Sequence, residues 1–301
     1  MTFRNLILVS FLFLTSSSWG QNRFFEPADS LHKGRLIATS VSTASIWTGS
    51  IIALNQVWYE GFEKTKLHSF DDSKEWMQMD KMGHLYTSYH LSHQAAKIYH
   101  WSGLNRKTSA WIGAGIGFGY QLTFEFLDGR SSAWGFSWSD LTANGIGSAL
   151  FLAQDLIWQE QKFKLKFSYF PTDYAQYRPN TLGSNFGESL LKDYNGQTYW
   201  LSFSPGTLFP KSNIPEWISI AAGYSVDQKL AGMADYYVTA DGLNTFHAQR
   251  EFVLSLDVDV TKLPIRKKWL KTILSPFNYI KIPFPAIVFE ANGVRGNWLY
   301  F

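Results

Sequence analysis

The chain has 301 residues, of which 46% are hydrophobic and 17% are charged. This composition supplies enough apolar residues for one large domain or two ordinary ones, and it excludes an intrinsically disordered chain. The 27 basic and 24 acidic residues leave a formal charge of only +3. Because the longest basic cluster, residues 266–268, is too short to follow a polyanion, nucleic acid is excluded as an expected partner. The absence of cysteine excludes disulfides and thiolate metal sites.

Aromatic residues are abundant, with 13 Trp, 15 Tyr and 24 Phe. These side chains are typical of membrane–water boundaries, where one end of the ring is apolar and the other is hydrated. The composition therefore indicates membrane lipid or other envelope components as partners, and it identifies no protein partner.

The first 20 residues predict a secretory signal peptide. Arg4 precedes an apolar run over residues 6–14, and the small residues Ser18 and Gly20 stand at positions suited to cleavage. We therefore expect an exported protein whose mature chain begins at Gln21.

Residues 21–161 have the pattern of a helical domain with four helices. The first, residues 36–59, contains no charged residue and is long enough to cross a bilayer, although its many Ser and Thr residues fit a buried helix equally well. The next two are expected over residues 73–101 and 108–127. The fourth begins at Ser137 or Ser139 and continues to about Gln161.

Four glycines at alternate positions distinguish the helix over residues 108–127. They are Gly113, Gly115, Gly117 and Gly119. Glycines four residues apart give a helix a flat surface that a neighbouring backbone can approach closely, so we expect a tight, Gly-rich four-helix bundle. The series lacks both the Gly-x-Gly-x-x-Gly spacing and the preceding strand of a dinucleotide-binding loop.

Residues 162–301 form a β-rich C-terminal region. Polar and apolar residues alternate over residues 162–169, 199–204, 217–224 and 251–260, which predicts antiparallel strands, while residues 262–277 suggest an amphipathic helix. The predicted fold class is therefore α+β, with domains at residues 21–161 and 162–301 after the signal peptide at 1–20. The final strand closes on an aromatic residue, as in outer-membrane barrel proteins, but six or seven strands are too few for a closed barrel.

A set of polar residues occurs at the ends of the predicted helices. Asp80 and His84 lie one turn apart on one helix face, with Lys81 beside them. Glu125 stands near the end of the next helix. Two further polar residues at positions i and i+4, Asp140 and Asn144, open the one after it. If the three helices are antiparallel neighbours, these six side chains meet at one end of the bundle.

The ordered set Asp80-Lys81-x-x-His84, a Gly-rich helix ending with Glu125, and Asp140-Leu-x-Ala-Asn144 resembles the YfiM-type predicted periplasmic lipoproteins. It is similar, more remotely, to VanZ-like membrane proteins. The resemblance covers about residues 76–158 and implies a compact, membrane-associated helical domain of the cell envelope without an assigned activity. Because the chain has no cysteine, we expect it to lack the N-terminal lipid of a lipoprotein.

Two interpretations of the six residues remain open. Carboxylates with an imidazole can bind a divalent ion or serve as a catalytic acid–base centre, although the set contains only one histidine. Alternatively, Lys81 pairs with Glu125 or Asp140 and the network fixes helix register, an interpretation that we favour. The remaining histidines of the second helix, at positions 90, 93 and 100, are expected to be surface or packing residues, and Ser137 or Ser139 to cap a helix.

The sequence thus predicts an exported, membrane-associated protein of the cell envelope with unassigned activity, acting in a structural or binding role. The alternative is a membrane-associated hydrolase or lipid-modifying enzyme that uses the Asp/His/Glu cluster. We expect a periplasm-facing location, with the outer membrane favoured over the inner membrane. The residues identify no cofactor and leave open whether a metal is bound.

Overall fold

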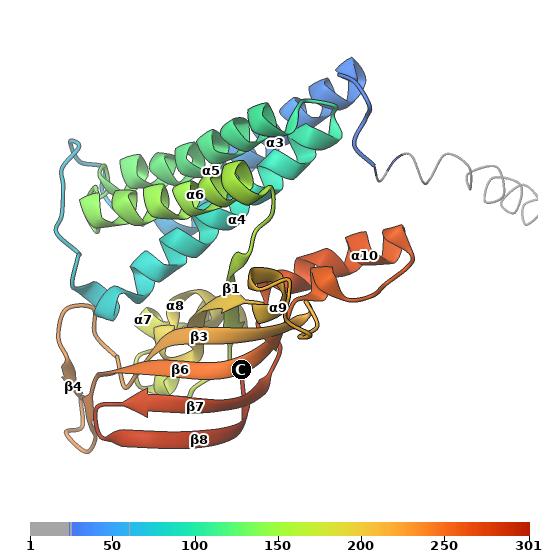
Figure 1. Ribbon diagram of the computed structural model, residues 1–301. Coiled ribbons are helices and arrows are strands. Elements are labelled where there is room, and N and C mark those ends of the chain that lie inside the picture. The colour runs from blue at the N-terminus through green and yellow to red at the C-terminus, as the bar shows by residue number, and fades with distance from the viewer. Residues whose placement is uncertain (1–23, 25, 60) are drawn as a thin grey trace, which may run out of the picture.

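The computed structural model describes Phe24, residues 26–59 and residues 61–301. The predicted signal peptide lies outside these residues. The predicted α+β class is confirmed, because helices make up the N-terminal half and a six-stranded antiparallel sheet lies in the C-terminal half (Figure 1).

Within the described residues, four long helices precede the sheet. They are α3 (Lys33–Leu54), α4 (Met79–Trp101), α5 (Arg106–Asp128) and α6 (Trp138–Trp158). Ser137 and Ser139 were the two predicted caps of α6, and the structure shows Ser137 in this position. Its side chain accepts a hydrogen bond from the backbone N–H of Asp140. A π-helical turn, η1 (Asn55–Tyr59), continues α3.

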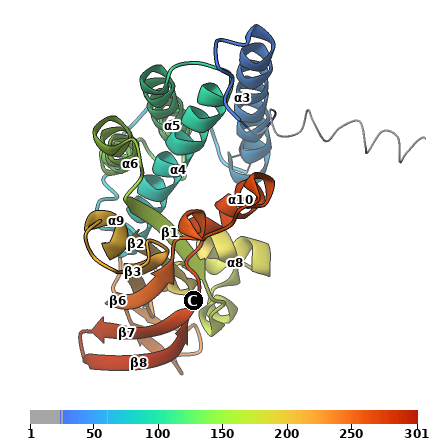
Figure 2. The same cartoon turned by 45° about the vertical axis from the view of Figure 1, so that its right-hand side comes forward.

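Helices α4, α5 and α6 pack closely through glycine. A Cβ atom added at Gly113 of α5 would lie 2.7 Å from the backbone nitrogen of Ala96 in α4, and one at Gly147 of α6 would lie 3.0 Å from the backbone nitrogen of Tyr89. The predicted Gly-mediated contact is therefore present. Helix α3 lies at the side of this group (Figure 2), and Thr39 is its one buried residue.

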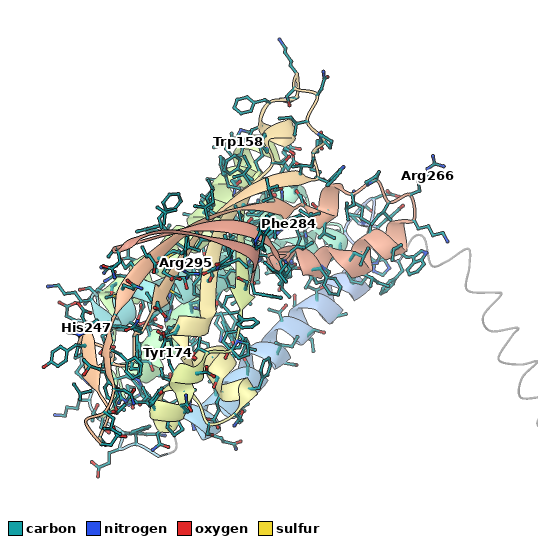
Figure 3. The ribbon with its side chains drawn as sticks, turned by 90° about the horizontal axis from the view of Figure 1, so that it is seen from below. Trp158, Tyr174, His247, Arg266, Phe284 and Arg295 are labelled. Atoms are coloured by element: carbon teal, nitrogen blue, oxygen red, sulfur yellow. The ribbon has the colours of Figure 1, made fainter. Side chains whose placement is uncertain are left out.

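The main sheet has the strand order β1-β2-β3-β6-β7-β8, and all neighbouring strands are antiparallel. Its strands are β1 (Phe163–Tyr169), β2 (Gln197–Phe203), β3 (Ile218–Asp227), β6 (Gln249–Val258), β7 (Phe284–Glu290) and β8 (Gly293–Tyr300). A separate hairpin is formed by β4 (Tyr236–Val238) and β5 (Thr245–His247). Figure 3 shows the sheet from below, with Phe284 and Arg295 marking β7 and β8.

Short helices fill the connections of the C-terminal half. They are η3 (Asp173–Tyr177), α7 (Pro179–Leu182), α8 (Phe186–Lys192), η4 (Tyr194–Gly196), α9 (Pro205–Leu208), η5 (Val260–Lys262), α10 (Lys268–Leu274) and η6 (Ser275–Tyr279). The continuous helix predicted over residues 262–277 is wrong in its extent. Pro264 lacks an N–H and disfavours helix in the preceding residue, so α10 begins only at Lys268.

The two faces of the main sheet differ in polarity. On the inner face, Trp200 of β2 lies beside Gly223 of β3, whose missing side chain leaves room for the indole ring, and Val253 of β6 follows in the same row. Buried ionic residues such as Lys166 and Asp257 share this face. The outer face carries exposed apolar side chains on the last three strands, here called the apolar sheet face: Phe252, Leu254, Leu256, Ile287, Phe289 and Val294.

Helix α4 joins the helices to the sheet. Met79, at the start of α4, packs with Tyr199 of β2 and Val226 of β3 in one buried cluster. The ring of Tyr86 also lies 6.0 Å from that of Phe167 in β1. The side chains that follow Met79 in α4 are thereby held at the junction between the helices and the sheet.

The start of α4 differs from the prediction. Helix was expected from Ser73, but the 3-10 turn η2 (Glu75–Gln78) precedes α4, and Trp76, Met77 and Gln78 have positive φ angles of 48°, 52° and 67°. Such angles are unfavourable for residues with a side chain, so tertiary contacts must hold this turn. Trp76 donates its backbone N–H to Gly232 O at 2.8 Å, and the side-chain oxygen of Gln78 accepts a hydrogen bond from Arg250.

Candidate functional site

The six polar residues predicted from the sequence lie in one network where α4, α5 and α6 meet. Lys81 Nζ is 2.9 Å from Asp140 Oδ1, and His84 Nδ1 is 3.5 Å from Glu125 Oε1. The same ring nitrogen is 3.1 Å from Asn144 Oδ1. The predicted juxtaposition is therefore confirmed, while the role of these residues stays a prediction.

Lys81 is the centre of an ion-paired group that is richer in acid than in base. Its Nζ atom lies 2.7 Å from Asp72 Oδ2, 2.9 Å from Asp140 Oδ1 and 3.3 Å from Asp80 Oδ2. The sequence analysis expected Lys81 to pair with Glu125 or Asp140, and in the structure it pairs with Asp140. Glu125 instead points toward His84 and accepts a hydrogen bond from the backbone N–H of Ser137 at 3.3 Å.

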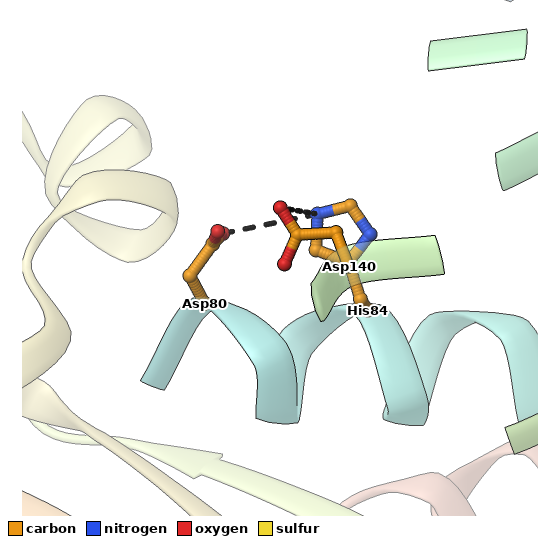
Figure 4. Close-up of side chains that lie close together, drawn as sticks. All are labelled: Asp80, His84 and Asp140. Carbon is orange, nitrogen blue, oxygen red and sulfur yellow. Dashed lines mark ion pairs between the residues drawn. The ribbon is translucent and has the colours of Figure 1, made fainter. Parts of the chain in front are cut away.

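His84 faces the second carboxylate oxygen of Asp80 and that of Asp140. Its Nε2 atom is 3.9 Å from Asp80 Oδ1 and 3.8 Å from Asp140 Oδ2, and Figure 4 shows both carboxylates beside the imidazole ring. The side chains of His84 and Asp80 are 18% and 31% exposed. Solvent therefore reaches this side of the network.

Asp72 belongs to the network but was missed by the sequence analysis. Its Oδ1 atom accepts hydrogen bonds from the hydroxyls of Ser137 at 2.6 Å and Ser139 at 2.7 Å, and Oδ2 pairs with Lys81. It lies in a loop eight residues before Asp80, where no helical spacing relates it to the others. Its one sequence signal is an acidic pair, Asp71-Asp72, just before the helix.

The sheet half also contributes to the network. Tyr194, in the turn before β2, donates its hydroxyl to Asp80 Oδ1 at 3.1 Å. On the bundle side, Gln121 Nε2 donates to Asn144 Oδ1 at 3.2 Å. Since Tyr194 lies 114 residues after Asp80, its contact depends on how α4 packs against the sheet.

The acidic residues of the network do not all shift in the same direction: the pKa values of Glu125 and Asp140 are raised and that of Asp72 is lowered. Burial raises the pKa of Glu125 to about 8. Burial and the nearby Asp80 charge raise the pKa of Asp140 to about 7. Burial also acts to raise the pKa of Asp72, but hydrogen bonds from Lys81 and Ser137 outweigh it and bring the value to about 2.

Neighbouring carboxylates raise the pKa values of the two basic residues against the effect of burial. Burial alone would lower the pKa of Lys81, but Asp80 and Asp140 raise it above its ordinary value. Burial likewise opposes the charge on His84, and the carboxylates of Asp80, Asp140 and Glu125 raise its pKa. The network therefore contains proton donors and acceptors at near-neutral pH, which is the property required of an acid–base centre.

The residue types also suit a metal ion. Asp80, His84 and Asp140 each offer a ligand atom, and these atoms lie within 4.8 Å of one another.

The other three histidines of α4 have different surroundings. His90 Nε2 contacts Leu165 O at 2.8 Å, the His93 ring lies 5.5 Å from Phe151, and His100 Nδ1 contacts Leu104 O at 2.9 Å, so all three make packing contacts as predicted.

The six predicted residues and Asp72 lie in a part of the chain that matches a known family. Residues 68–154 match a family described as "Predicted periplasmic lipoprotein (DUF2279)". The matched segment runs from the loop containing Asp72 through most of α6, and it contains all six predicted residues. No curated protein and no solved structure matches the chain.

The fold is α+β, and the family match supports an exported, periplasm-facing location in the cell envelope with unassigned activity. The matched family covers the helical part that holds the network. The sheet half, residues 162–301, lies outside the match.

Proposed function

We propose that the protein is a structural or binding component of the cell envelope that lies against a membrane through α3 and the apolar sheet face. We favour the outer membrane over the inner membrane. The observation that carries the proposal is the exposure of α3. This helix is long and apolar enough to cross a bilayer, with a mean hydropathy of 1.4, yet only 6% of its most apolar window is buried.

Three of the exposed side chains of α3 are large and apolar. Ile37, Val41 and Ile46 are 63%, 59% and 71% exposed. Transfer of a large aliphatic side chain from water to an apolar phase contributes about 1.5–3 kcal/mol, so three such residues supply several kcal/mol toward membrane association. The other side of the helix packs on the bundle, where the Trp47 ring lies 5.5 Å from that of Tyr120.

The polarity of the sheet supports the same proposal. Leu254 and Ile287 are 44% and 46% exposed on the apolar sheet face, whereas the opposite face buries the ion pair of Lys166 and Asp257. Strands of outer-membrane proteins likewise place apolar side chains toward lipid and polar side chains inward. This pattern is our reason for favouring the outer membrane.

Fractionation of cells that express the full chain tests the role of α3. We expect the wild-type protein to stay with membranes after a high-salt wash. Replacing Ile37, Val41 and Ile46 together by Gln should release it into the soluble fraction. A matched control replaces the exposed Ser42 and Ser45 of the same helix by Gln and should remain membrane-bound. Retention of the triple variant would contradict a role for α3, and density separation of the two membranes tests the preference for the outer membrane.

Site-specific labelling tests the apolar sheet face. Because the chain has no cysteine, Leu254→Cys introduces a single site for a polarity-sensitive dye. We expect its emission to shift to shorter wavelength when lipid vesicles are added. The control is Leu243→Cys, in the loop between β4 and β5, where the side chain is 80% exposed. Equal responses at both positions would contradict selective lipid contact by the apolar sheet face.

A second candidate function is a membrane-associated hydrolase or lipid-modifying enzyme. The observation that favours it is the solvent-accessible imidazole of His84 beside the carboxylates of Asp80 and Asp140. The test compares Asp80→Asn and His84→Ala with the wild-type gene in the cell. Normal folding with loss of the wild-type phenotype supports the enzyme. Loss of stability with no separable functional defect supports a structural role.

A further inference from the structure

We propose that Asp80, His84 and Asp140 bind one divalent transition-metal ion, with Zn²⁺ as the best-fitting candidate. The proposal goes beyond membrane association and does not depend on it. It is carried by the direction in which His84 presents its ring nitrogens, by the arrangement of the carboxylate oxygens, and by the charge of the group.

The hydrogen bonds of His84 determine which ring nitrogen is available. Nδ1 lies 3.1 Å from Asn144 Oδ1, which also accepts a hydrogen bond from Gln121 Nε2 at 3.2 Å. An amide oxygen is an acceptor only, so Nδ1 carries the proton and the neutral ring has its lone pair on Nε2. A histidine that donates from one ring nitrogen to a fixed acceptor while the other faces the metal is the usual arrangement at metal sites.

His84 Nε2 faces one carboxylate oxygen of Asp80 and one of Asp140. Asp80 Oδ1 is 3.9 Å away and Asp140 Oδ2 is 3.8 Å away, and both distances exceed that of a hydrogen bond. When Nε2 is unprotonated, these three electron-rich atoms repel one another, and a metal cation between them removes that repulsion. Zinc ligands lie about 2.0–2.2 Å from the ion, which places tetrahedral ligand atoms about 3.3–3.6 Å apart. Nε2 therefore needs to approach each of these two oxygens by only about half an ångström.

Lys81 pairs with one oxygen of the Asp80 carboxylate and one oxygen of the Asp140 carboxylate, so the two oxygens of each carboxylate have different surroundings. Its Nζ atom lies 3.3 Å from Asp80 Oδ2 and 2.9 Å from Asp140 Oδ1, the two oxygens that do not face Nε2 most closely. The ammonium group thus holds both carboxylates in place, with one oxygen of each on the side of Nε2. Of these two oxygens, Asp80 Oδ1 also accepts a hydrogen bond from the Tyr194 hydroxyl. Positioning of ligands by neighbouring charged groups is a common feature of metal sites.

The charges around Lys81 also favour a divalent ion. Three carboxylates, those of Asp72, Asp80 and Asp140, contact this one ammonium group. When all three are ionised, two negative charges remain unbalanced, which one divalent cation would neutralise. The presence of an imidazole ligand favours Zn²⁺ over Mg²⁺ or Ca²⁺, which prefer oxygen ligands. Three protein ligands leave one coordination position for water, and the partial exposure of Asp80 gives solvent access.

The test is calorimetric titration of Zn²⁺ into the purified, detergent-solubilised full chain after chelator treatment. We expect one Zn²⁺ per chain and a rise in the melting temperature on binding. His84→Gln should weaken Zn²⁺ binding at least tenfold, and Asp80→Asn, which changes a partly exposed side chain, should do the same. The matched control is His100→Gln, on the same helix but outside the network, and it should bind as the wild type does.

Three results would overturn the proposal. The first is no Zn²⁺ uptake by the wild-type chain, which needs no variant to interpret. The second is wild-type affinity in His84→Gln or in Asp80→Asn when circular dichroism shows a folded protein. The third is an equal loss of binding in His100→Gln, which would place the metal on other histidines. Competition by excess Mg²⁺ as strong as that by Co²⁺ would likewise exclude an imidazole-containing site.

Discussion

The helices and the sheet each bury a group of ionic side chains, and the two groups are built differently. In the sheet, Lys166 of β1 and Asp257 of β6 form a one-to-one pair at 2.6 Å, and both side chains are 0% exposed. In the bundle, three carboxylates surround the single ammonium group of Lys81, and one of them, Asp80, is partly exposed.

The two groups therefore differ in how far their polar atoms are already hydrogen-bonded or ion-paired within the chain. Asp257 uses its oxygens on Lys166, the hydroxyl of Ser202 and the backbone N–H of Ile282. His84 Nε2 faces two carboxylate oxygens without a hydrogen bond to either. We therefore expect changes in the sheet pair to alter stability, and changes around His84 to alter ligand binding as well.

The largest effect is expected from Asp257→Ala. Removing this carboxylate leaves the fully buried charge of Lys166 without its partner, so unfolding in denaturant should show a loss of about 4 kcal/mol. The double variant Lys166→Met with Asp257→Leu removes both charges and should lie within about 1 kcal/mol of the wild type. A loss below about 1 kcal/mol in the single variant would contradict a tightly paired sheet interior.

The next largest effect is expected at the glycine-mediated contact between α4 and α5, the helices that carry part of the polar network. A Cβ at Gly117 would lie 2.7 Å from Ser88 O, so Gly117→Ala should force α4 and α5 apart and cost about 3 kcal/mol. Gly115→Ala is the matched control, because its Cβ meets no atom within 4 Å and alanine favours helix by up to about 1 kcal/mol. Similar denaturation midpoints for the two variants would contradict glycine-mediated packing.

A smaller, pH-dependent effect is expected in the sheet. Burial lowers the pKa of Lys281 to about 8, although Asp257 acts to raise it, with Lys166 again lowering it. Because the native state loses this proton first, the unfolded state binds more protons between about pH 8 and 10.5, and stability should increase with pH over that range. Over this range the wild type should gain about 1–3 kcal/mol more than Lys281→Met. Denaturation at several pH values measures it, and identical pH dependence in both proteins would contradict it.

The smallest effect is expected from Glu125→Gln in the bundle. The sequence interpretation paired Lys81 with Glu125 or Asp140, and in the first case the loss of Glu125 would cost about 3 kcal/mol or more. The structure gives Lys81 three other carboxylates, and Gln retains an oxygen that can accept the Ser137 N–H. Chemical denaturation should therefore show a change below about 1 kcal/mol. A larger loss would show that the network depends on a negative charge at Glu125.

Local patterns predicted most of the helices and several strands. The 3.6-residue spacing located α4, α5 and α6, and alternation located β1, β2, β3 and β6. Strand β7 was missed, because Pro285 interrupts its short apolar run, and the left-handed turn at residues 76–78 contradicts the local preference of its residues. The turn exists because contacts from Gly232 and Arg250 hold it.

The sequence by itself determined the α+β class and the meeting of Asp80, Lys81, His84, Glu125, Asp140 and Asn144. Helical periodicity fixes which side chains share a face, and antiparallel packing of neighbouring helices brings their ends together. Only the tertiary structure decided that Asp72 and Tyr194 join them, and that His84 Nε2 faces two carboxylates. Those contacts come from a loop and from the sheet, where position depends on long-range packing and no periodic spacing in the sequence specifies it.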